Sequence, residues 1–228
     1  MSTATMIAPT VANPFQMTAN NSSGNYETCP QNNYPAVVAG LIDLGTHEQT
    51  YDDGKKGKAR KAALLIQIGD AYAKMSDGKP FIFLKEINIS SFGKKSAARK
   101  IAEAIVGRPF ADGENYPLTD LIGKSCQANI KHNPGKEGKV YANLDTIASL
   151  AVGVQPVAMA MEPIVWFHGC GTEFPGIGAN LWSYGQTLKQ IYQDSDEYRA
   201  EFGGPAGGKD VPPKGGADAE LKDEDIPF

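Results

Sequence analysis

Apolar residues in this chain form short runs that are separated by polar, glycine-containing segments. Residues 36–44 are β-branched and apolar around an internal Gly40, which predicts a bent strand suited to a barrel. Residues 62–68 contain helix-favouring Ala and Leu, but their length and the Gly-Asp that follows favour a strand. Residues 81–89 follow a clear turn at 76–80 and predict a third strand.

A helical period replaces this pattern over residues 93–106. Ala98, Ile101 and Ile105 fall on one face, Arg99 and other charged residues fall elsewhere, and Gly107 is a natural helix end. We therefore expect one amphipathic helix after the third strand.

Residues 126–131 and 140–147 predict two further strands joined by a flexible, basic turn. Five strands with a helix between the third and the fourth is the order of an OB-fold, a small Greek-key barrel that commonly binds oligonucleotides. The predicted fold is therefore mainly β with some α: a five-stranded OB-fold barrel that carries a C-terminal extension and a flexible acidic tail.

Leu181, Tyr184, Leu188, Ile191 and Tyr192 form an amphipathic stripe that we interpret as a helix docking on the core rather than a cofactor site. We expect the ordered structure to begin near Tyr34. Four regions follow: an N-terminal arm that is disordered or loosely packed (1–33), the OB-fold domain (34–153), an extension that packs on the barrel (154–202), and a flexible Gly/Pro linker with an acidic tip (203–228).

Charge is divided unevenly along the chain. The net charge is −4, yet residues 50–140 hold 17 Lys and Arg against 10 Asp and Glu, a balance of +7. Residues 186–228 hold 5 basic against 10 acidic residues, a balance of −5. A basic body with an acidic tail predicts a polyanion partner for the body.

Two basic segments lie where an OB-fold places the loops beside its binding groove: a long polar loop at 47–60 with the lysine that follows it, and the last hairpin. Nearby aromatic residues could stack on bases, and Tyr141 is preferred because it follows Lys139. Phe81 and Phe83 share a face of their strand, so both are buried or both are exposed. The alternatives are solvated lysines and aromatics packed in the core. The candidate DNA-binding residues are Lys55, Lys56, Lys58, Arg60, Lys61, Phe83, Phe92, Lys94, Lys131, Lys136, Lys139 and Tyr141.

The chain ends in an acidic run closed by an aromatic residue. Such a tip fits a hydrophobic pocket rimmed by Lys or Arg on another protein, and proline limits the entropy lost on docking. The candidate partner-binding residues are Asp223, Glu224, Asp225, Ile226, Pro227 and Phe228. This tip closely resembles that of bacterial single-stranded-DNA-binding proteins, which recruits replication and repair enzymes. The charge division also suggests that the tail folds back on the empty DNA groove.

Signatures of catalysis and of cofactor binding are weak. Gly123-Lys124-Ser125 resembles the end of a phosphate-binding loop, but Leu118 stands where that loop requires glycine. The three histidines are isolated, and the three cysteines have no CxxC spacing. No apolar run has transmembrane length. We expect a protein without enzymatic activity, cofactor, metal site or membrane contact.

A second resemblance covers residues 34–153. It rests on the segments at 77–80, 95–100, 107–110 and 121–126, and most specifically on Gly138-Lys139-Val140-Tyr141-Ala142-Asn143. These segments look like those of a family of bacteriophage OB-fold proteins associated with replication, which implies single-stranded-DNA binding. The arm and residues 156–195 have no counterpart that we can place.

The sequence thus predicts a sequence-nonspecific single-stranded-DNA-binding protein of the infected host's cytoplasm or nucleoid. It would protect DNA and recruit a helicase, primase, polymerase or nuclease during replication, recombination or repair. Two alternatives stay open: a non-catalytic interaction or assembly factor with an OB-like barrel, and a DNA-processing nuclease.

Overall fold

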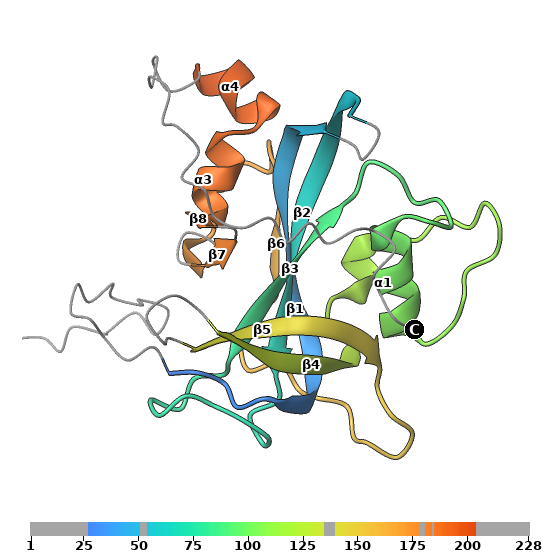
Figure 1. Ribbon diagram of the computed structural model, residues 1–228, viewed down its shortest axis with the longest axis vertical. Helices are drawn as coiled ribbons and strands as arrows, with labels where there is room; N and C mark the ends of the chain where they lie inside the picture. Colours follow the sequence, from blue (N-terminus) through green and yellow to red (C-terminus); the bar gives the residue numbers. More distant parts are fainter. Residues whose placement is uncertain (1–26, 51–53, 135–139, 178–180, 184, 204–228) are drawn as a thin grey trace, which may run out of the picture.

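The computed structural model of the 228-residue chain describes residues 27–50, 54–134, 140–177, 181–183 and 185–203 (Figure 1). Strands dominate these residues, so the predicted mainly β fold is confirmed. The elements in chain order are β1 (Asn32–Thr50), β2 (Lys56–Ile68), β3 (Ile82–Asn88), α1 (Ala97–Val106), the 3-10 helix η1 (Leu118–Leu121), β4 (Ser125–Pro134), β5 (Val140–Ser149), β6 (Ile164–Trp166), β7 (Trp182–Ser183), β8 (Gln186–Thr187), α3 (Leu188–Gln193) and α4 (Asp196–Phe202).

The main sheet runs in the order β3-β2-β1-β4-β5, and each neighbouring pair on this path is antiparallel. All five predicted strands and the helix between the third and the fourth are present. The path is open, because no pairing joins β3 to β5 among the described residues. These two end strands nevertheless approach each other, and α1 packs against both.

Strand β1 is long, bent and paired with three other strands. Residues 32–37 pair with β4, residues 36–50 pair with β2, and Gly40–Ile42 pair in parallel with β6. The bend includes a register shift between Val38 and Gly40. A Cβ at Gly40 would lie 2.7 Å from the Ile164 carbonyl oxygen, so β6 can approach only because this residue is glycine. The predicted bent strand around Gly40 is confirmed.

The segment predicted as a basic loop at 47–60 is instead a β-ribbon, so the loop prediction is wrong. Strand β1 continues to Thr50 and β2 already begins at Lys56, with Glu48 opposite Lys58 and Thr46 opposite Arg60. Successive side chains of each strand point to opposite faces of the ribbon, and the opposite charges of Glu48 and Lys58 face each other across it. Polar composition alone does not distinguish such a solvated ribbon from a loop.

Helix α1 begins later than predicted, at Ala97, because the Ser96 hydroxyl caps it by accepting from the Arg99 backbone N–H. Gly107 ends it in the left-handed conformation, as predicted (φ 76°). Arg99 was predicted to lie off the buried face but is only 4% exposed. Its guanidinium donates to the Glu103 carboxylate and to the carbonyls of Phe110 and Ala111, and these bonds make its burial tolerable.

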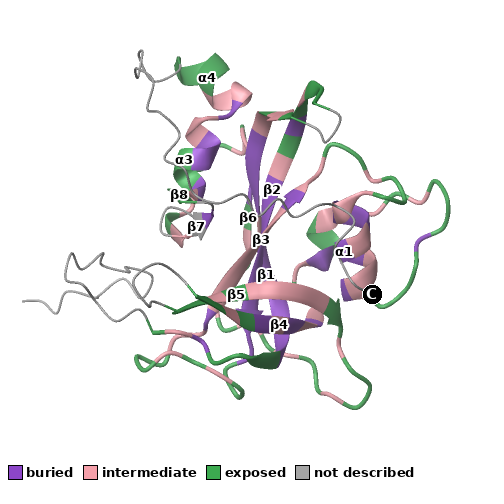
Figure 2. Ribbon diagram, in the orientation of Figure 1, coloured by how far each residue is buried: buried purple, intermediate pink, exposed green. Residues whose placement is uncertain are grey.

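Two apolar cores lie on opposite sides of β1 and β2 (Figure 2). The first fills the space between the sheet and α1, and Ala98, Ile101 and Ile105 enter it as predicted. It also contains Cys29, which is 1% exposed, so the ordered structure begins before the expected start near Tyr34. The second core is built from Ile42, Leu44, Ala63, Leu65, Trp166, Leu188, Ile191 and Tyr192.

The C-terminal extension supplies the outer half of this second core. Leu188, Ile191 and Tyr192 are buried on α3, as the apolar stripe predicted. The helical stripe does not reach back to Leu181, however, because the short β7–β8 hairpin intervenes and Gly185 takes a positive φ of 85° there. Tyr184 and the predicted linker and tip beyond Gly203 lie outside the described residues.

Candidate nucleic-acid interface

The β4–β5 ribbon carries the most exposed aromatic candidate, Tyr141. Tyr141 is 52% exposed and is the second residue of β5. Figure 2 shows exposed and intermediate positions along this strand. Tyr141 lies opposite Asn133, and Lys131 lies opposite Asn143. Residues opposite each other in an antiparallel pair, and those two apart along a strand, share a face. We call the four residues Lys131, Asn133, Tyr141 and Asn143 the ribbon face.

The other side of this ribbon points into the first core, where Ile130 is buried opposite Leu144. The ribbon face is therefore held in place by packing behind it. Asn133 and Asn143 were not among the candidates from the sequence. Asn143 is two residues from Tyr141 along β5, so strand alternation alone places the two on one face. Asn133 could be added only with the strand register, which puts it opposite Tyr141.

Lys131 on this face is not a free cation. Its ammonium lies 2.7 Å from Asp145, and both side chains are accessible to water. An exposed pair of this kind is weak, so a phosphate can compete for the lysine. The other two candidates of this hairpin, Lys136 and Lys139, lie outside the described residues.

The β1–β2 ribbon places three basic candidates, Lys56, Lys58 and Arg60, on one face, because they alternate along β2. Lys61 points to the other side and pairs with Glu86 of β3 at 2.7 Å. Lys55 lies just before β2 and is exposed. The structure thus distributes these five residues over both sides of a ribbon instead of gathering them in one loop.

Like Lys61, both Lys58 and Arg60 are paired with carboxylates. Lys58 pairs with Asp196 of α4 at 2.7 Å, and the bond raises the pKa of Lys58. Arg60 makes a two-pronged contact with Asp43, at 3.2 Å from Nε to Oδ1 and 2.6 Å from Nη2 to Oδ2. Burial opposes ionisation of Asp43, but its bonds from Arg60 and the Gly45 N–H prevail and lower the pKa of the carboxyl.

The remaining aromatic candidates face the first core. Phe83 is partly buried and packs against that core, next to the buried Phe81, so the two share the inner face. Phe92 also packs there, with its ring 5.7 Å from that of Phe110. Lys94 is exposed and pairs with Asp112 at 2.8 Å. Phe83 and Phe92 thus pack in the core instead of presenting their rings on the ribbon face.

The C-terminal extension covers much of the outer face of β1 and β2. Besides the second core, Gln67 is fully buried and accepts from the Ala160 N–H at 3.0 Å, which fixes the segment before β6 against β2. An OB-fold commonly uses strands 2 and 3 for ligands. In this sheet the extension covers part of the outer face of β2, and the ribbon face stays open.

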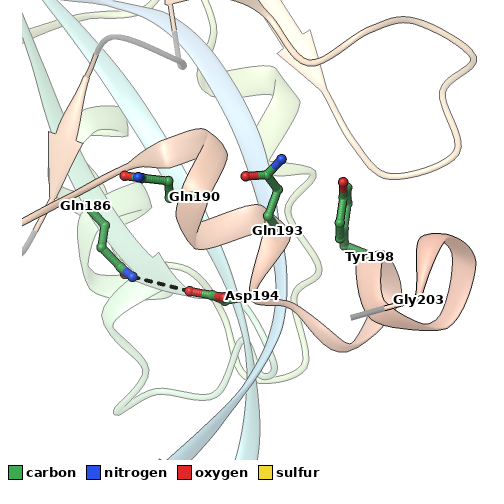
Figure 3. Close-up of a pocket in the computed structure, with 6 residues that line it drawn as sticks. All are labelled: Gln186, Gln190, Gln193, Asp194, Tyr198 and Gly203. Carbon is green, nitrogen blue, oxygen red and sulfur yellow. Dashed lines mark hydrogen bonds between the residues drawn. The ribbon is translucent and has the colours of Figure 1, made fainter. Parts of the chain in front are cut away.

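A polar pocket of about 380 Å³ lies between α3 and α4 (Figure 3). Gln186 Nε2 donates to Asp194 at 3.2 Å within it. The residues that line it are Gln186, Gln190, Gln193, Asp194, Tyr198 and Gly203. These are amide, carboxylate and phenol groups, without a paired nucleophile and base among them.

Within the described ranges, no three His, Cys, Asp or Glu side chains are grouped so as to hold a metal ion. The cysteines are free thiols: burial raises the pKa of Cys29 to about 11 and that of Cys126 to about 12, whereas a bond with the Thr172 hydroxyl lowers the pKa of Cys170. None of the helices described here has the length and apolar character needed to cross a bilayer.

Comparison with known proteins adds no relative to this description. A scan against models of protein families finds no match for the chain, and a search of curated proteins finds none either.

Proposed function

We propose that this protein binds single-stranded DNA without catalysis and with little sequence preference, and that the strand runs along the ribbon face. The observation that carries the proposal is the half-exposed Tyr141 ring, which lies diagonally across the two-stranded ribbon from Lys131. Bases stack on such rings whatever their identity, and each stack is worth about 1–3 kcal/mol. Asn133 and Asn143 add hydrogen-bonding groups at the same surface.

We further propose that the sheet acts as an OB-type barrel closed by α1 rather than by strand pairing. The path β3-β2-β1-β4-β5, with the helix between β3 and β4, supports this reading. So does the contact of α1 with both end strands. The OB-fold is itself a partly open barrel. In this frame the β1–β2 and β4–β5 ribbons flank one binding region.

The acidic tip at 223–228 completes the proposal as the site that recruits replication or recombination enzymes. Its role is separable from DNA binding, because the ribbon face contains no residue of the tail. Removing the last six residues should abolish recruitment of partner enzymes while the chain still binds DNA.

The direct test is fluorescence anisotropy of a labelled oligo-dT titrated with the full chain at low and high salt, with a blunt duplex of equal length for comparison. We expect saturable binding of the single strand that weakens steeply with salt, since phosphate contacts release counterions. Absence of saturable binding at low salt, or binding that salt does not weaken, would overturn the proposal.

One observation favours a second candidate, a non-catalytic protein-interaction factor. Lys58 and Arg60 are already engaged by Asp196 and Asp43, and the extension covers the outer face of the sheet. Cations that are already neutralised by carboxylates of the same chain do not by themselves indicate a polyanionic ligand. Under this alternative, the same titration shows no binding while the folded chain still captures a protein through its tip.

A further inference from the structure

A bulge in β1 creates a cluster of hydrogen-bond donors at the edge of the β1–β2 ribbon. The register shifts between Asp43 and Gly45, and Gly45 takes a left-handed φ of 79°. The Gly45 N–H donates to Asp43 Oδ1 at 3.1 Å, and the Thr46 N–H, which points away from β2, donates to Glu197 at 2.7 Å. The two successive N–H groups thus bind different carboxylates, and the Thr46 N–H is the one that binds an anion from another part of the chain.

Glu197 occupies this site with both carboxylate oxygens. Its Oε2 accepts from the Thr46 N–H and its Oε1 from the Thr46 hydroxyl, each at 2.7 Å. The preceding residue, Asp196, accepts from the Lys58 ammonium at 2.7 Å. Proteins hold the phosphates of nucleic acids with the same groups: backbone N–H groups, hydroxyls and ammonium groups that donate to the phosphate oxygens.

The two carboxylates are delivered by the first turn of α4, which fits closely against the bulge. Ser195, the residue before α4, is fully buried, and a Cβ at Gly45 would lie 2.5 Å from its Cβ. The contact thus depends on Gly45 as well as on charge.

Helix α4 is nevertheless held lightly. None of its residues is buried, whereas the neighbouring α3 buries Leu188, Ile191 and Tyr192. Its other contacts include Tyr198, which is partly buried against the second core with its ring 5.3 Å from that of Tyr192. Glu201 also pairs with His168 at 3.3 Å, and Arg199 pairs with Asp194 at 3.8 Å. Elements with few buried contacts open at a small fraction of the global stability. Of α4, only Tyr198 packs against the second core, and it is partly exposed, so α4 can open while the buried residues of α3 stay in place.

We infer that Thr46 and Lys58 form a phosphate site on the β1–β2 ribbon, and that the Asp196 and Glu197 carboxylates of α4 occupy it until single-stranded DNA displaces them. The inference rests on the proposed function and adds a second point of strand contact, away from the ribbon face. Its ligand is the phosphodiester, and the carboxylates stand in its place. Binding there exchanges one set of anionic partners for another, so α4 weakens DNA binding in the closed state.

The test uses the double variant D196N/E197Q, which keeps the shapes of both side chains and removes their charges. The matched control is D77N/D120N, which removes two exposed charges elsewhere and leaves the candidate DNA contacts untouched. With labelled oligo-dT at low salt, we expect D196N/E197Q to bind about fivefold more tightly than the control, because exposed charge contacts are each worth a factor of about two to five. Adding T46V and K58Q to D196N/E197Q should remove that gain.

Hydrogen exchange of the full chain provides the second readout. Saturating oligo-dT should increase amide exchange over residues 196–202 of the natural chain and leave exchange over 188–193 unchanged. Circular dichroism of each variant controls for folding.

The outcomes separate the two proposals. If the natural chain binds DNA but D196N/E197Q matches its control and exchange over 196–202 does not rise, the phosphate site is wrong and the DNA-binding function stands. If the natural chain binds and D196N/E197Q binds more tightly than its control, both proposals are supported. If the natural chain does not bind at low salt, both proposals are overturned.

Discussion

Asp43 is the side chain on which the sheet and the C-terminal extension meet. It accepts from Arg60 of β2 and from the Gly45 N–H, and the backbone N–H of His168 also bonds to it. The carboxylate is almost fully buried, whereas the guanidinium of Arg60 is partly exposed. Asp43 is thus a charged group whose hydrogen bonds offset its desolvation.

The variant D43N should be destabilised at neutral pH, by about 1–3 kcal/mol, because it loses a charge-assisted bond while Arg60 can still reach water. The pKa of Asp43 is lowered by folding, so its contribution is present above the unfolded pKa of about 3.9 and is lost as pH falls below that value. Urea unfolding at pH 7 and pH 3 measures this. The difference between D43N and the natural chain should shrink at pH 3, and an equal difference at both would contradict it.

A second residue-scale prediction concerns base stacking. Y141A should weaken oligo-dT binding by about 1–3 kcal/mol without affecting stability, because the ring is exposed and, under the proposed function, stacks on bases. Tyr72 is 49% exposed in the turn region after β2 and provides the matched control Y72A. Anisotropy titrations of the two variants compare them directly. Equal losses of oligo-dT affinity in Y141A and Y72A would contradict a role for Tyr141 in DNA binding.

The sequence could identify Tyr141, because a tyrosine between a basic turn and a strand needs no tertiary information to be singled out. It could not identify the partners of the basic residues. Asp43 is near Arg60 only because β1 pairs with β2, and Asp196 reaches Lys58 across 138 positions of the chain. Pairing over such separations has no local signal, so a basic segment was expected to be free for DNA.

At the scale of elements, β6 shows how one residue type positions a strand. Its three residues pair with β1 at Gly40–Ile42 and carry Trp166 into the second core. The absence of a side chain at Gly40 permits this pairing, since the Ile164 oxygen and Cβ lie 2.7 and 3.0 Å from where a Cβ would be.

We therefore expect G40A to displace β6 and destabilise the protein by about 1–3 kcal/mol, as overpacking does in a close-packed core. Trp166 emission should shift to the red as its ring gains water, read in a W182F background so that it alone reports. The control is G93A, because a Cβ at Gly93 meets nothing within 4 Å. A G40A protein with natural stability and emission would refute the role given to Gly40.

Elements with a regular apolar period were the most predictable part of the fold. The five strands, the helix α1 and its end at Gly107 follow from local pattern. The β1–β2 ribbon and the β7–β8 hairpin did not, because their polar or short sequences carry no period that separates strand from loop. The predicted start of α1, at residue 93, was too early because the Ser96 cap fixes the start at Ala97.

At the scale of the whole molecule, two cores share the same pair of strands. Successive residues of β2, Leu64 and Leu65, enter the first and the second core respectively. The extension is therefore part of the folded unit rather than an addition to a finished barrel. The sequence predicted that it packs on the body, but could not predict which face it covers.

A chain that ends at Gly153 should consequently expose Ile42, Leu44 and Leu65, each worth about 1.5–3 kcal/mol of burial. We expect this truncated chain to bind 8-anilinonaphthalene-1-sulfonate and to unfold at lower denaturant concentration than the full chain. A control that ends at Gly203 keeps the second core and should behave as the full chain does. A stable, dye-free product ending at Gly153 would contradict the shared architecture.

The placement of β6 also bears on self-association. Where β4 separates from β1, the exposed backbone of a long, apolar strand would offer a template for pairing with another chain, and β6 covers it at Gly40–Ile42. The outer edge of β6 is itself only three residues long, so it offers a second chain little backbone to pair with. The parallel segment therefore protects the β1 edge at Gly40–Ile42 from pairing with a second copy of the chain.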